Sequence, residues 1–343
     1  MTVLPSWTFP PRIGDGILAC SHPVFARPVL QSDGTYQFHM LKALEYDAND
    51  YWLDIKSGRV PAVKFPCRKC LGCRLQKSED WAVRCLMEQC YHEHSWFLTL
   101  TYADGFVPKT FSVDRSTGEA ISPHMTLQKS DFQKFLKRLR KTQSVRYFAA
   151  GEYGSKTFRP HYHVILFGPD FPDKVRIQDG AAGGTYYTSE TISALWPFGM
   201  HVLGDCSFQS VAYVARYTMK KAQSDVRSVW ESFNIQPEFQ VMSLKPAIGY
   251  QYYLDHSDMF QFDRNYLKTP DGGRSYIPPE YFRKLERDKD PIRMTRRFEQ
   301  KLVNSRLRDQ IKFSLTSNHF HAILEIEEEV LEKRLSSLTR NQV

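Results

Sequence analysis

The polar and apolar positions in the middle of the chain predict two paired β-strands. Residues 160–168 alternate polar and apolar side chains through His161 and His163 and then continue as an apolar run. Side chains two residues apart in a strand project from the same face, so the two imidazoles would lie side by side. Residues 146–154 show a similar pattern, and the short, turn-rich connection predicts an antiparallel pair. This pairing would bring Glu152 close to both histidines.

A helical pattern follows over residues 207–221. The window contains no glycine or proline, and its apolar residues have helical spacing: Val211, Ala212, Val214, Ala215 and Met219. Tyr213 and Tyr217 are four residues apart and so share one face, which Lys220 and Lys221 continue. A phenol is a poor nucleophile near neutral pH unless cations or a metal favour the phenolate. The helix therefore combines two candidate nucleophiles with positive charge that would activate them.

The other periodic segments predict an α+β fold in which helices back an antiparallel sheet. We expect a helix over residues 76–94, a strand over 95–102 and a basic amphipathic helix over 127–142. With the strand pair above, this order suits a small sheet whose central strands carry the site and whose helices pack on it. Residues 169–187 are rich in glycine and aspartate and are predicted to form a loop near the substrate.

The chain changes character twice, which predicts three parts. Residues 1–75 are turn-rich and end in a cluster of cysteines, so we interpret them as an N-terminal Cys-rich cap. Residues 76–225 would form the core, and residues 226–343 a largely helical C-terminal extension. The extension repeats the histidine pattern at His319 and His321, but imidazoles two residues apart on a helix diverge, so no second site is expected there.

Two candidate metal sites of different chemistry emerge from these patterns. His161, His163 and Glu152 would offer nitrogen and oxygen ligands with open positions. Such a set suits Mg²⁺ or Mn²⁺ held partly by a substrate phosphate, whereas a closed site of sulfur and nitrogen suits zinc. The histidine pair alone is a weak signal, because neighbouring histidines on a strand often only form hydrogen bonds.

The second candidate is the run of Cys67, Cys70 and Cys73, whose three thiolates could converge on one ion. A tetrahedral structural zinc needs a fourth ligand, and Cys20 is our first choice for it. Two other residues could take that position, His22 and Cys85. Iron–sulfur ligation and a metal-free cluster are the alternatives, and the run lacks the fourth cysteine and following proline of a bacterial ferredoxin.

Composition narrows the compartment and the partner. The 343 residues carry a net charge of +8, which favours a polyanionic partner such as nucleic acid. Much of this charge lies between Lys129 and Arg146 on the predicted basic helix. Seven cysteines are an odd number in a chain of this length, so we expect reduced thiols rather than a disulfide framework. No apolar run of about eighteen residues and no signal-peptide pattern occur, which predicts a cytosolic protein without a membrane span.

In combination, these motifs resemble the replication initiators of the HUH endonuclease superfamily. The resemblance is specifically to those of small circular single-stranded DNA phages, the microviruses, in their gokushovirus-like branch. It extends over roughly residues 15–285 and rests on five segments: 96–102, 161–163, 195–201, 213–221 and the cysteine run 66–75.

The resemblance implies a ferredoxin- or RRM-like core and a metal-dependent DNA endonuclease that is also a strand transferase. One tyrosine, Tyr213 or Tyr217, would attack the phage origin in single-stranded DNA and form a 5′-phosphotyrosine link. A host polymerase would extend the free 3′-hydroxyl in rolling-circle replication, and a host helicase is a further expected partner. Lys220 is our choice for a positioning or acid role, with Lys221 as the runner-up. The expected location is the cytoplasm of a bacterial host.

Other classes of protein explain less of the sequence. A non-catalytic, zinc-stabilised nucleic-acid-binding protein would account for the charge and the cysteines, but it leaves Tyr213, Tyr217 and Lys220 without a role. A nucleotidyl hydrolase with three alternating histidines would need a histidine where the chain has Ile165. A relaxase or single-tyrosine transposase shares the metal motif but does not need two tyrosines on one helix.

Overall fold

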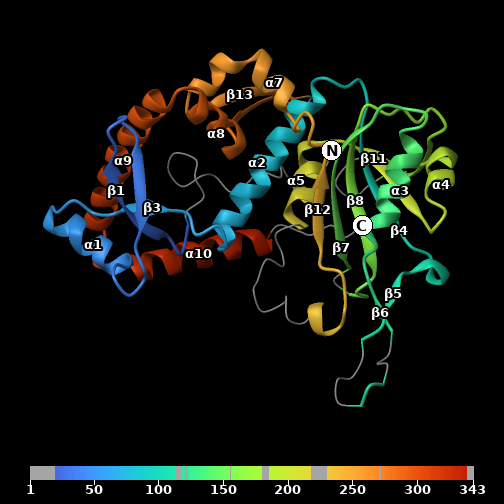
Figure 1. Cartoon of the computed structure of the whole chain (residues 1–343), viewed down its shortest axis with the longest axis horizontal. Helices are drawn as coiled ribbons and strands as arrows, with labels where there is room; N and C mark the ends of the chain where they lie inside the picture. Colours follow the sequence, from blue (N-terminus) through green and yellow to red (C-terminus); the bar gives the residue numbers. More distant parts are fainter. Residues whose placement is uncertain are drawn as a thin grey trace.

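A seven-stranded sheet in which all neighbouring strands are antiparallel forms the centre of the larger lobe (Figure 1). The computed structural model describes residues 20–112, 117–119, 123–154, 156–179, 185–217, 230–269 and 272–337. In spatial order the strands are β12 (Phe239–Met242), β7 (Arg146–Tyr153), β8 (Pro160–Phe167), β4 (Ser95–Thr101), β11 (His201–Asp205), β10 (Thr185–Thr188) and β9 (Val175–Asp179). The predicted α+β class with an antiparallel sheet is confirmed.

Alternation along β8 explains why this sheet has two buried faces. Tyr162, Val164 and Leu166 point to one face, and Ile165 and Phe167 point to the other together with the two histidines. Helices α2 (Leu71–Gln89) and α5 (Phe208–Tyr217) cover the histidine face, whereas α3 (Lys129–Leu139) and α4 (Glu190–Leu195) cover the opposite face. The sheet is therefore a middle layer between two helical layers.

The second lobe is built from both ends of the described chain. Its strands and helices are β1 (Val24–Leu30), β2 (Tyr36–Met40), β3 (Val63–Phe65), α1 (Ala48–Ser57), α9 (Pro291–Ser314) and α10 (Phe320–Ser337). Phe25 and Tyr51 from the N-terminal part pack with Phe313 and Phe320 from the C-terminal part in one hydrophobic core. The Tyr51 hydroxyl also donates a hydrogen bond to Asp309 over 2.6 Å. The division at residues 75 and 225 stays a prediction, but these two outer parts share a core.

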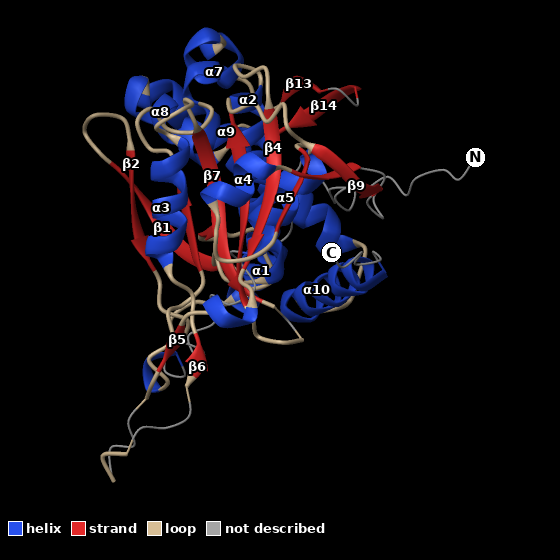
Figure 2. Ribbon diagram, turned by 90° about the vertical axis from the view of Figure 1, so that its right-hand side faces the viewer, coloured by secondary structure: helices blue, strands red, loops and turns tan. Residues whose placement is uncertain are grey.

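Smaller elements connect and extend the two lobes. They are the 3-10 helices Asp104–Phe106 and Ser257–Gln261, the strands β5 (Lys109–Thr110), β6 (His124–Met125), β13 (Asn265–Thr269) and β14 (Gly272–Tyr276), and the helices α7 (Tyr250–Asp255) and α8 (Glu280–Lys289). Figure 2 shows β5 and β6 projecting away from the body of the molecule. They leave the sheet at the end of β4, which is the end where the histidine strand β8 begins.

Two details correct the sequence expectations. Residues 169–187 are not simply a loop, because β9 and β10 lie within and beside them and pair as edge strands of the sheet. The predicted helix over 76–94 begins earlier, at Leu71, and ends at Gln89. Cys70 is its N-cap residue, so the cysteine run forms the start of this helix rather than a separate loop.

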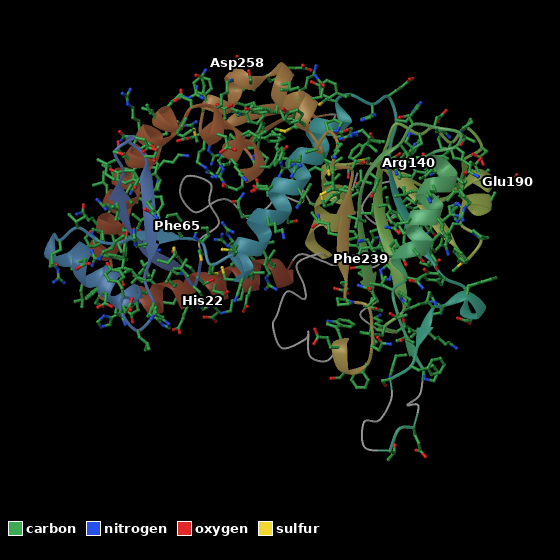
Figure 3. The ribbon with its side chains drawn as sticks, in the orientation of Figure 1. His22, Phe65, Arg140, Glu190, Phe239 and Asp258 are labelled. Carbon is green, nitrogen blue, oxygen red and sulfur yellow. The ribbon has the colours of Figure 1, made fainter. Side chains whose placement is uncertain are left out.

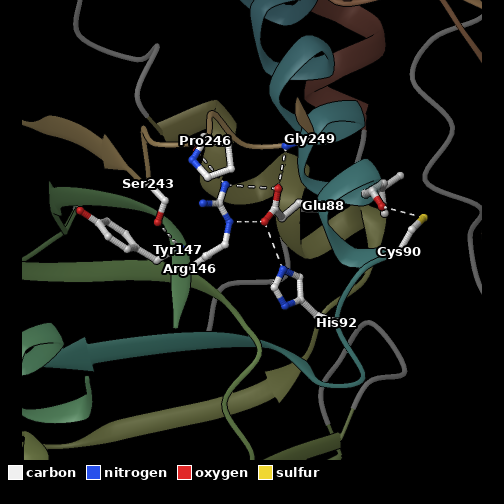
Figure 4. Close-up of polar contacts among 9 residues, drawn as sticks. Glu88, Cys90, His92, Arg146, Tyr147, Ser243, Pro246 and Gly249 are labelled. Atoms are coloured by element: carbon white, nitrogen blue, oxygen red, sulfur yellow. Dashed lines mark hydrogen bonds and ion pairs between the residues drawn. The ribbon is translucent and has the colours of Figure 1, made fainter. Parts of the chain in front are cut away.

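A buried carboxylate fixes α2 against the sheet (Figure 4). Glu88 accepts hydrogen bonds from the Arg146 guanidinium at the start of β7, from His92 and from the backbone amide of Gly249. Burial alone would raise the pKa of Glu88, but these donors lower it to about 2. Gly249 has a φ of 75°, and a Cβ there would lie 2.9 Å from the carbonyl oxygen of Arg84. The turn before α7 therefore requires glycine to reach Glu88.

Candidate metal and tyrosine site

The β7–β8 hairpin brings Glu152, His161 and His163 together. Glu152 and His161 are direct partners in the strand register, and His163 is two residues further on the same face. One oxygen of Glu152 lies 2.7 Å from Nε2 of His161 and 2.9 Å from Nε2 of His163. Glu152 and His163 are buried, and His161 is partly exposed. One potential ligand atom from each residue lies within 4.8 Å of the others, a spacing that could hold a metal ion.

Hydrogen bonds behind the ligands fix the orientation of both imidazoles. Nδ1 of His161 lies 3.0 Å from the carbonyl oxygen of Arg159, and Nδ1 of His163 lies 2.9 Å from the hydroxyl of Thr99. A carbonyl oxygen only accepts, so His161 carries a proton on Nδ1 and directs Nε2 toward Glu152. This is the usual arrangement around metal-binding histidines, in which a second polar group sets the tautomer. Sequence inspection missed Thr99 and Arg159, since nothing but strand register reveals them.

The charges of the triad favour one another. Burial alone would raise the pKa of Glu152, but the hydrogen bonds from the two histidines hold it below the usual value. Burial alone would lower the pKa of His161, but its hydrogen bond with ionised Glu152 and the charge of that carboxylate raise it. The carboxylate is therefore ionised at neutral pH. A divalent cation would replace the proton that His161 otherwise shares with Glu152.

Tyr213 lies beside this triad. It projects from α5 toward the sheet, and its ring centroid is 5.2 Å from that of His163 and 6.1 Å from that of Phe97, in edge-on contacts. Tyr217 is the last residue of α5, and its side chain lies outside the described part of the structure, as do Lys220 and Lys221. Of the predicted nucleophile face, the described residues thus bring Tyr213 to the histidines.

Packing against α2 sets the rotation of the tyrosine helix. Val211, Ala212, Val214 and Ala215 are buried, and they share one core with residues 82–87 of α2. The hydroxyl of Ser78 also donates a hydrogen bond to the carbonyl oxygen of Ala212 over 3.3 Å. Because these small and branched residues occupy the helix-facing side, the side chain of Tyr213 is directed toward β4 and β8.

Residues 195–201 hold the end of β4 opposite His161. The indole of Trp196 donates a hydrogen bond to the carbonyl oxygen of Thr101 over 2.9 Å, and Thr101 is the register partner of His161. A Cβ at Gly199 would overlap that same carbonyl oxygen and the backbone nitrogen of Ala103. Only glycine allows this close backbone approach.

The second candidate site lies in the other lobe, at the start of α2. One sulfur each from Cys20, Cys67, Cys70 and Cys73 lies within 4.8 Å of the others. Cys20 and Cys70 approach to 3.8 Å, and Cys67 and Cys73 to 4.0 Å. The residue preferred as fourth ligand is therefore the one that the fold brings to the run. Its two rivals lie elsewhere: His22 pairs with Glu328 of α10 over 3.2 Å, and Cys85 is buried within α2 (Figure 3).

Backbone amides surround the sulfurs and would stabilise thiolates. The amide of Cys67 donates to the sulfur of Cys20 over 3.2 Å, and the amides of Lys69 and Cys70 donate to the sulfur of Cys67 over 3.4 and 3.3 Å. The hydrogen bond with Cys70 raises the pKa of Cys20 to about 12, so without a cation the cluster retains protons. Four sulfurs with amide donors at a helix N-terminus are suited to a tetrahedral soft cation.

The basic helix lies away from the metal triad. Helix α3 packs on the opposite face of the sheet, and Figure 3 shows Arg140 far from the cysteine lobe. Arg138 donates hydrogen bonds to the carbonyl oxygen of Leu195, and Arg140 lies over the ring of Tyr147 at 5.5 Å. Part of the predicted phosphate-binding charge therefore supports packing of the fold instead.

Comparisons with known proteins agree with this architecture. Residues 95–222 match the family described as replication-associated protein ORF2. Replication-associated protein ORF2 of Spiroplasma virus 4 is 34% identical over 228 residues, covering 65% of this chain and 68% of the relative. Replication-associated protein VP4 of Bdellovibrio phage phiMH2K is 33% identical over 237 residues, covering 66% and 68%. Replication-associated protein ORF4 of Chlamydia phage 1 is 29% identical over 282 residues, covering 77% and 64%. No solved structure matches significantly.

The chain belongs to this family, the replication-associated proteins of microviruses. Family membership confirms the resemblance to microvirus replication initiators on which the sequence interpretation rested. The matched region contains both the histidine hairpin and the tyrosine helix. None of the described helices has the length and apolar character needed to cross a bilayer.

Proposed function

We propose that the protein starts rolling-circle replication by nicking single-stranded phage origin DNA, storing the cleaved bond on a tyrosine and later rejoining the strand. The observation that carries this proposal is the position of Tyr213, whose ring lies 5.2 Å from that of His163. A nucleophile next to candidate metal ligands on one sheet face is what an HUH-type strand transferase requires. The reaction would take place in the cytoplasm of a bacterial host.

Glu152, His161 and His163 fit Mg²⁺ or Mn²⁺. Two imidazole nitrogens and a carboxylate oxygen converge from one side, and no thiolate belongs to the described group. Such a set leaves positions for water and a phosphate oxygen. When bound, the ion would polarise an oxygen of the scissile phosphate and offset the charge that develops on it.

Tyr213 would act as a nucleophile. Its phenolate oxygen attacks phosphorus while the bond from phosphorus to the 3′ oxygen breaks, which gives a 5′-phosphotyrosine and a 3′-hydroxyl together. The phenol proton leaves the nucleophile, and the departing oxygen receives one, a role that we assign to Lys220 with Lys221 as the runner-up. Rejoining reverses the exchange, since a 3′-hydroxyl attacks the phosphotyrosine, and no ATP is consumed.

Two tyrosines would allow the enzyme to stay attached through a full cycle. After one circuit, Tyr217 or Tyr213, whichever is unmodified, cleaves the regenerated origin while the other link is resolved. A host polymerase would extend the 3′-hydroxyl, and a host helicase would open the duplex ahead of it.

For the sulfur cluster we propose a structural zinc. Cys20, Cys67, Cys70 and Cys73 supply four sulfurs, the number that a closed tetrahedral site needs. The ion would tie the residue before β1 to the start of α2. Elemental analysis of purified protein should find about one zinc per chain and no iron. Iron with a visible charge-transfer spectrum would support the iron–sulfur alternative instead.

The nicking function is tested with labelled single-stranded phage DNA and Mn²⁺, followed by denaturing electrophoresis. We expect a protein-linked fragment that EDTA, His161→Ala and the double Tyr213→Phe, Tyr217→Phe variant each abolish. Tight DNA binding without any adduct, across fragments covering a whole phage genome, would favour the non-catalytic nucleic-acid-binding protein.

A further inference from the structure

The hairpin loop between β7 and β8 exposes an aromatic ring close to the metal triad. Phe158 is 39% exposed, whereas its neighbours Tyr153 and Trp230 are 5% and 7% exposed. The ring centroids of Phe158 and Tyr153 are 4.5 Å apart with planes at 9°, and those of Phe158 and Trp230 are 5.7 Å apart at 19°. Three nearly parallel rings thus form a cluster in which Phe158 is the solvent-exposed member.

The backbone holds Phe158 in a conformation that bulky residues rarely adopt. Its φ is 55°, in the left-handed region. The amide of Phe158 donates to the carbonyl oxygen of Gly154 over 2.9 Å, and the amide of Gly154 donates to that of Arg159 over 2.9 Å. These two bonds close the loop around the ring. Backbone strain of this kind concentrates at binding and catalytic sites.

The loop is joined directly to the metal ligands. Tyr153 follows Glu152, and the carbonyl oxygen of Arg159, the residue after Phe158, fixes the imidazole of His161. Three residues of extended chain span at most about 10 Å, so Phe158 lies within about three nucleotides of a phosphate at the triad. Tyr153 belongs to the core of the opposite sheet face, so a DNA strand would turn around the hairpin end to reach the ring.

We propose that Phe158 is a stacking platform for one base of the single-stranded DNA that flanks the nick, an inference that rests on the proposed nicking function. Aromatic rings bind bases of single strands by stacking, because every base has a π-face. The ring is pre-positioned on Tyr153 and Trp230, so binding a base would require little ordering of the side chain. The exposed Lys156 in the same loop adds positive charge for the adjoining phosphates.

The test measures DNA affinity with single abasic sites placed at each position around the nick. Oligonucleotides containing the nicking sequence are titrated by fluorescence anisotropy against full-length protein in the double Tyr213→Phe, Tyr217→Phe background, which prevents cleavage. One abasic position within about three nucleotides of the nick should weaken binding about 5- to 100-fold.

The variants decide whether Phe158 causes this loss. Phe158→Gly suits the left-handed backbone and removes the ring, so its affinity should fall by a similar factor and no longer depend on that base. Phe158→Tyr should keep the dependence. Phe158→Leu preserves apolar packing and should behave like the glycine variant, which guards against a folding defect. Phe262→Ala is the matched control, because Phe262 is an exposed aromatic in the region of α7 and α8.

Two results would overturn the platform in different ways. If Phe158→Gly keeps the wild-type affinity and abasic profile while wild-type protein still forms the covalent adduct, the ring only closes the hairpin. If wild-type protein forms no adduct with any phage fragment, the nicking function fails and the platform fails with it.

Discussion

The two candidate metal sites differ in how the chain builds them. Glu152, His161 and His163 come from one hairpin, in which strand register alone places a carboxylate beside two imidazoles. In the cysteine cluster, Cys20 joins a run that begins 47 residues later, at Cys67. The first site offers mixed nitrogen and oxygen ligands and retains an exposed edge at His161, whereas the second offers four sulfurs enclosed by backbone amides.

This contrast indicates different tasks for the two sites. An open set of hard ligands leaves room for a phosphate, but a closed set of soft ligands leaves none. Helix α2 connects them, since Cys70 is its N-cap residue and Ser78 contacts the tyrosine helix. We therefore expect changes at the triad to affect chemistry without stability, and changes at the cysteines to affect stability before chemistry.

The largest effect should come from Glu152→Gln. This substitution keeps the shape of the side chain but removes the charge that two imidazoles share, so metal-dependent nicking should fall by at least about 1,000-fold. Rates of adduct formation at saturating Mn²⁺ measure it. The zinc content should not change. Glu93→Gln, at a side chain that is 90% exposed, is the control and should behave like the wild type.

Cys67→Ser should have the opposite profile. Loss of one sulfur ligand should release zinc and lower the free energy of unfolding by at least about 3 kcal/mol, because the binding energy of a structural ion is also folding energy. Chemical denaturation and elemental analysis give the two values. Cys90→Ser, at an exposed cysteine outside the cluster, should leave both unchanged. An unchanged zinc content in Cys67→Ser would contradict a four-sulfur site.

Glu88 provides a pH-dependent test of the helix that links the sites. Its folded pKa of about 2 is below the unfolded value, so its contribution to stability is complete above about pH 4.3 and is lost as the pH falls toward 2. The wild type should therefore lose roughly 2–3 kcal/mol of stability across this window that Glu88→Gln does not lose. Urea denaturation of both proteins at several pH values measures the difference. Parallel pH curves would disprove the role of Glu88.

Thr99→Val should have the smallest effect. Valine matches the shape of threonine but cannot form the hydrogen bond to Nδ1 of His163, so affinity for Mn²⁺ should fall roughly tenfold. The Mn²⁺ dependence of nicking measures this change, and Thr99→Ser should restore most of the affinity. Equal weakening by both variants would indicate a packing defect rather than a lost hydrogen bond.

Local sequence patterns were enough to predict the hairpin triad, because a two-residue period and a short turn determine which side chains meet. The tyrosine helix was equally local. Cys20 was found only because a tetrahedral site needs a fourth ligand. No pattern indicated that Phe25 and Phe320 share a core, since long-range packing leaves no periodic signal. The strands β9 and β10 were missed because edge strands with glycine-rich connections resemble loops.

The most direct test of the central claim is peptide mass spectrometry of the covalent adduct. Trypsin cleaves after Arg216, so Tyr213 and Tyr217 fall on different peptides and can be distinguished. The account predicts a nucleotide linked through phosphate to one of these two tyrosines, and to Tyr213 alone in Tyr217→Phe. A nucleotide on any other residue, or an adduct that forms equally well in Glu152→Gln, would contradict it.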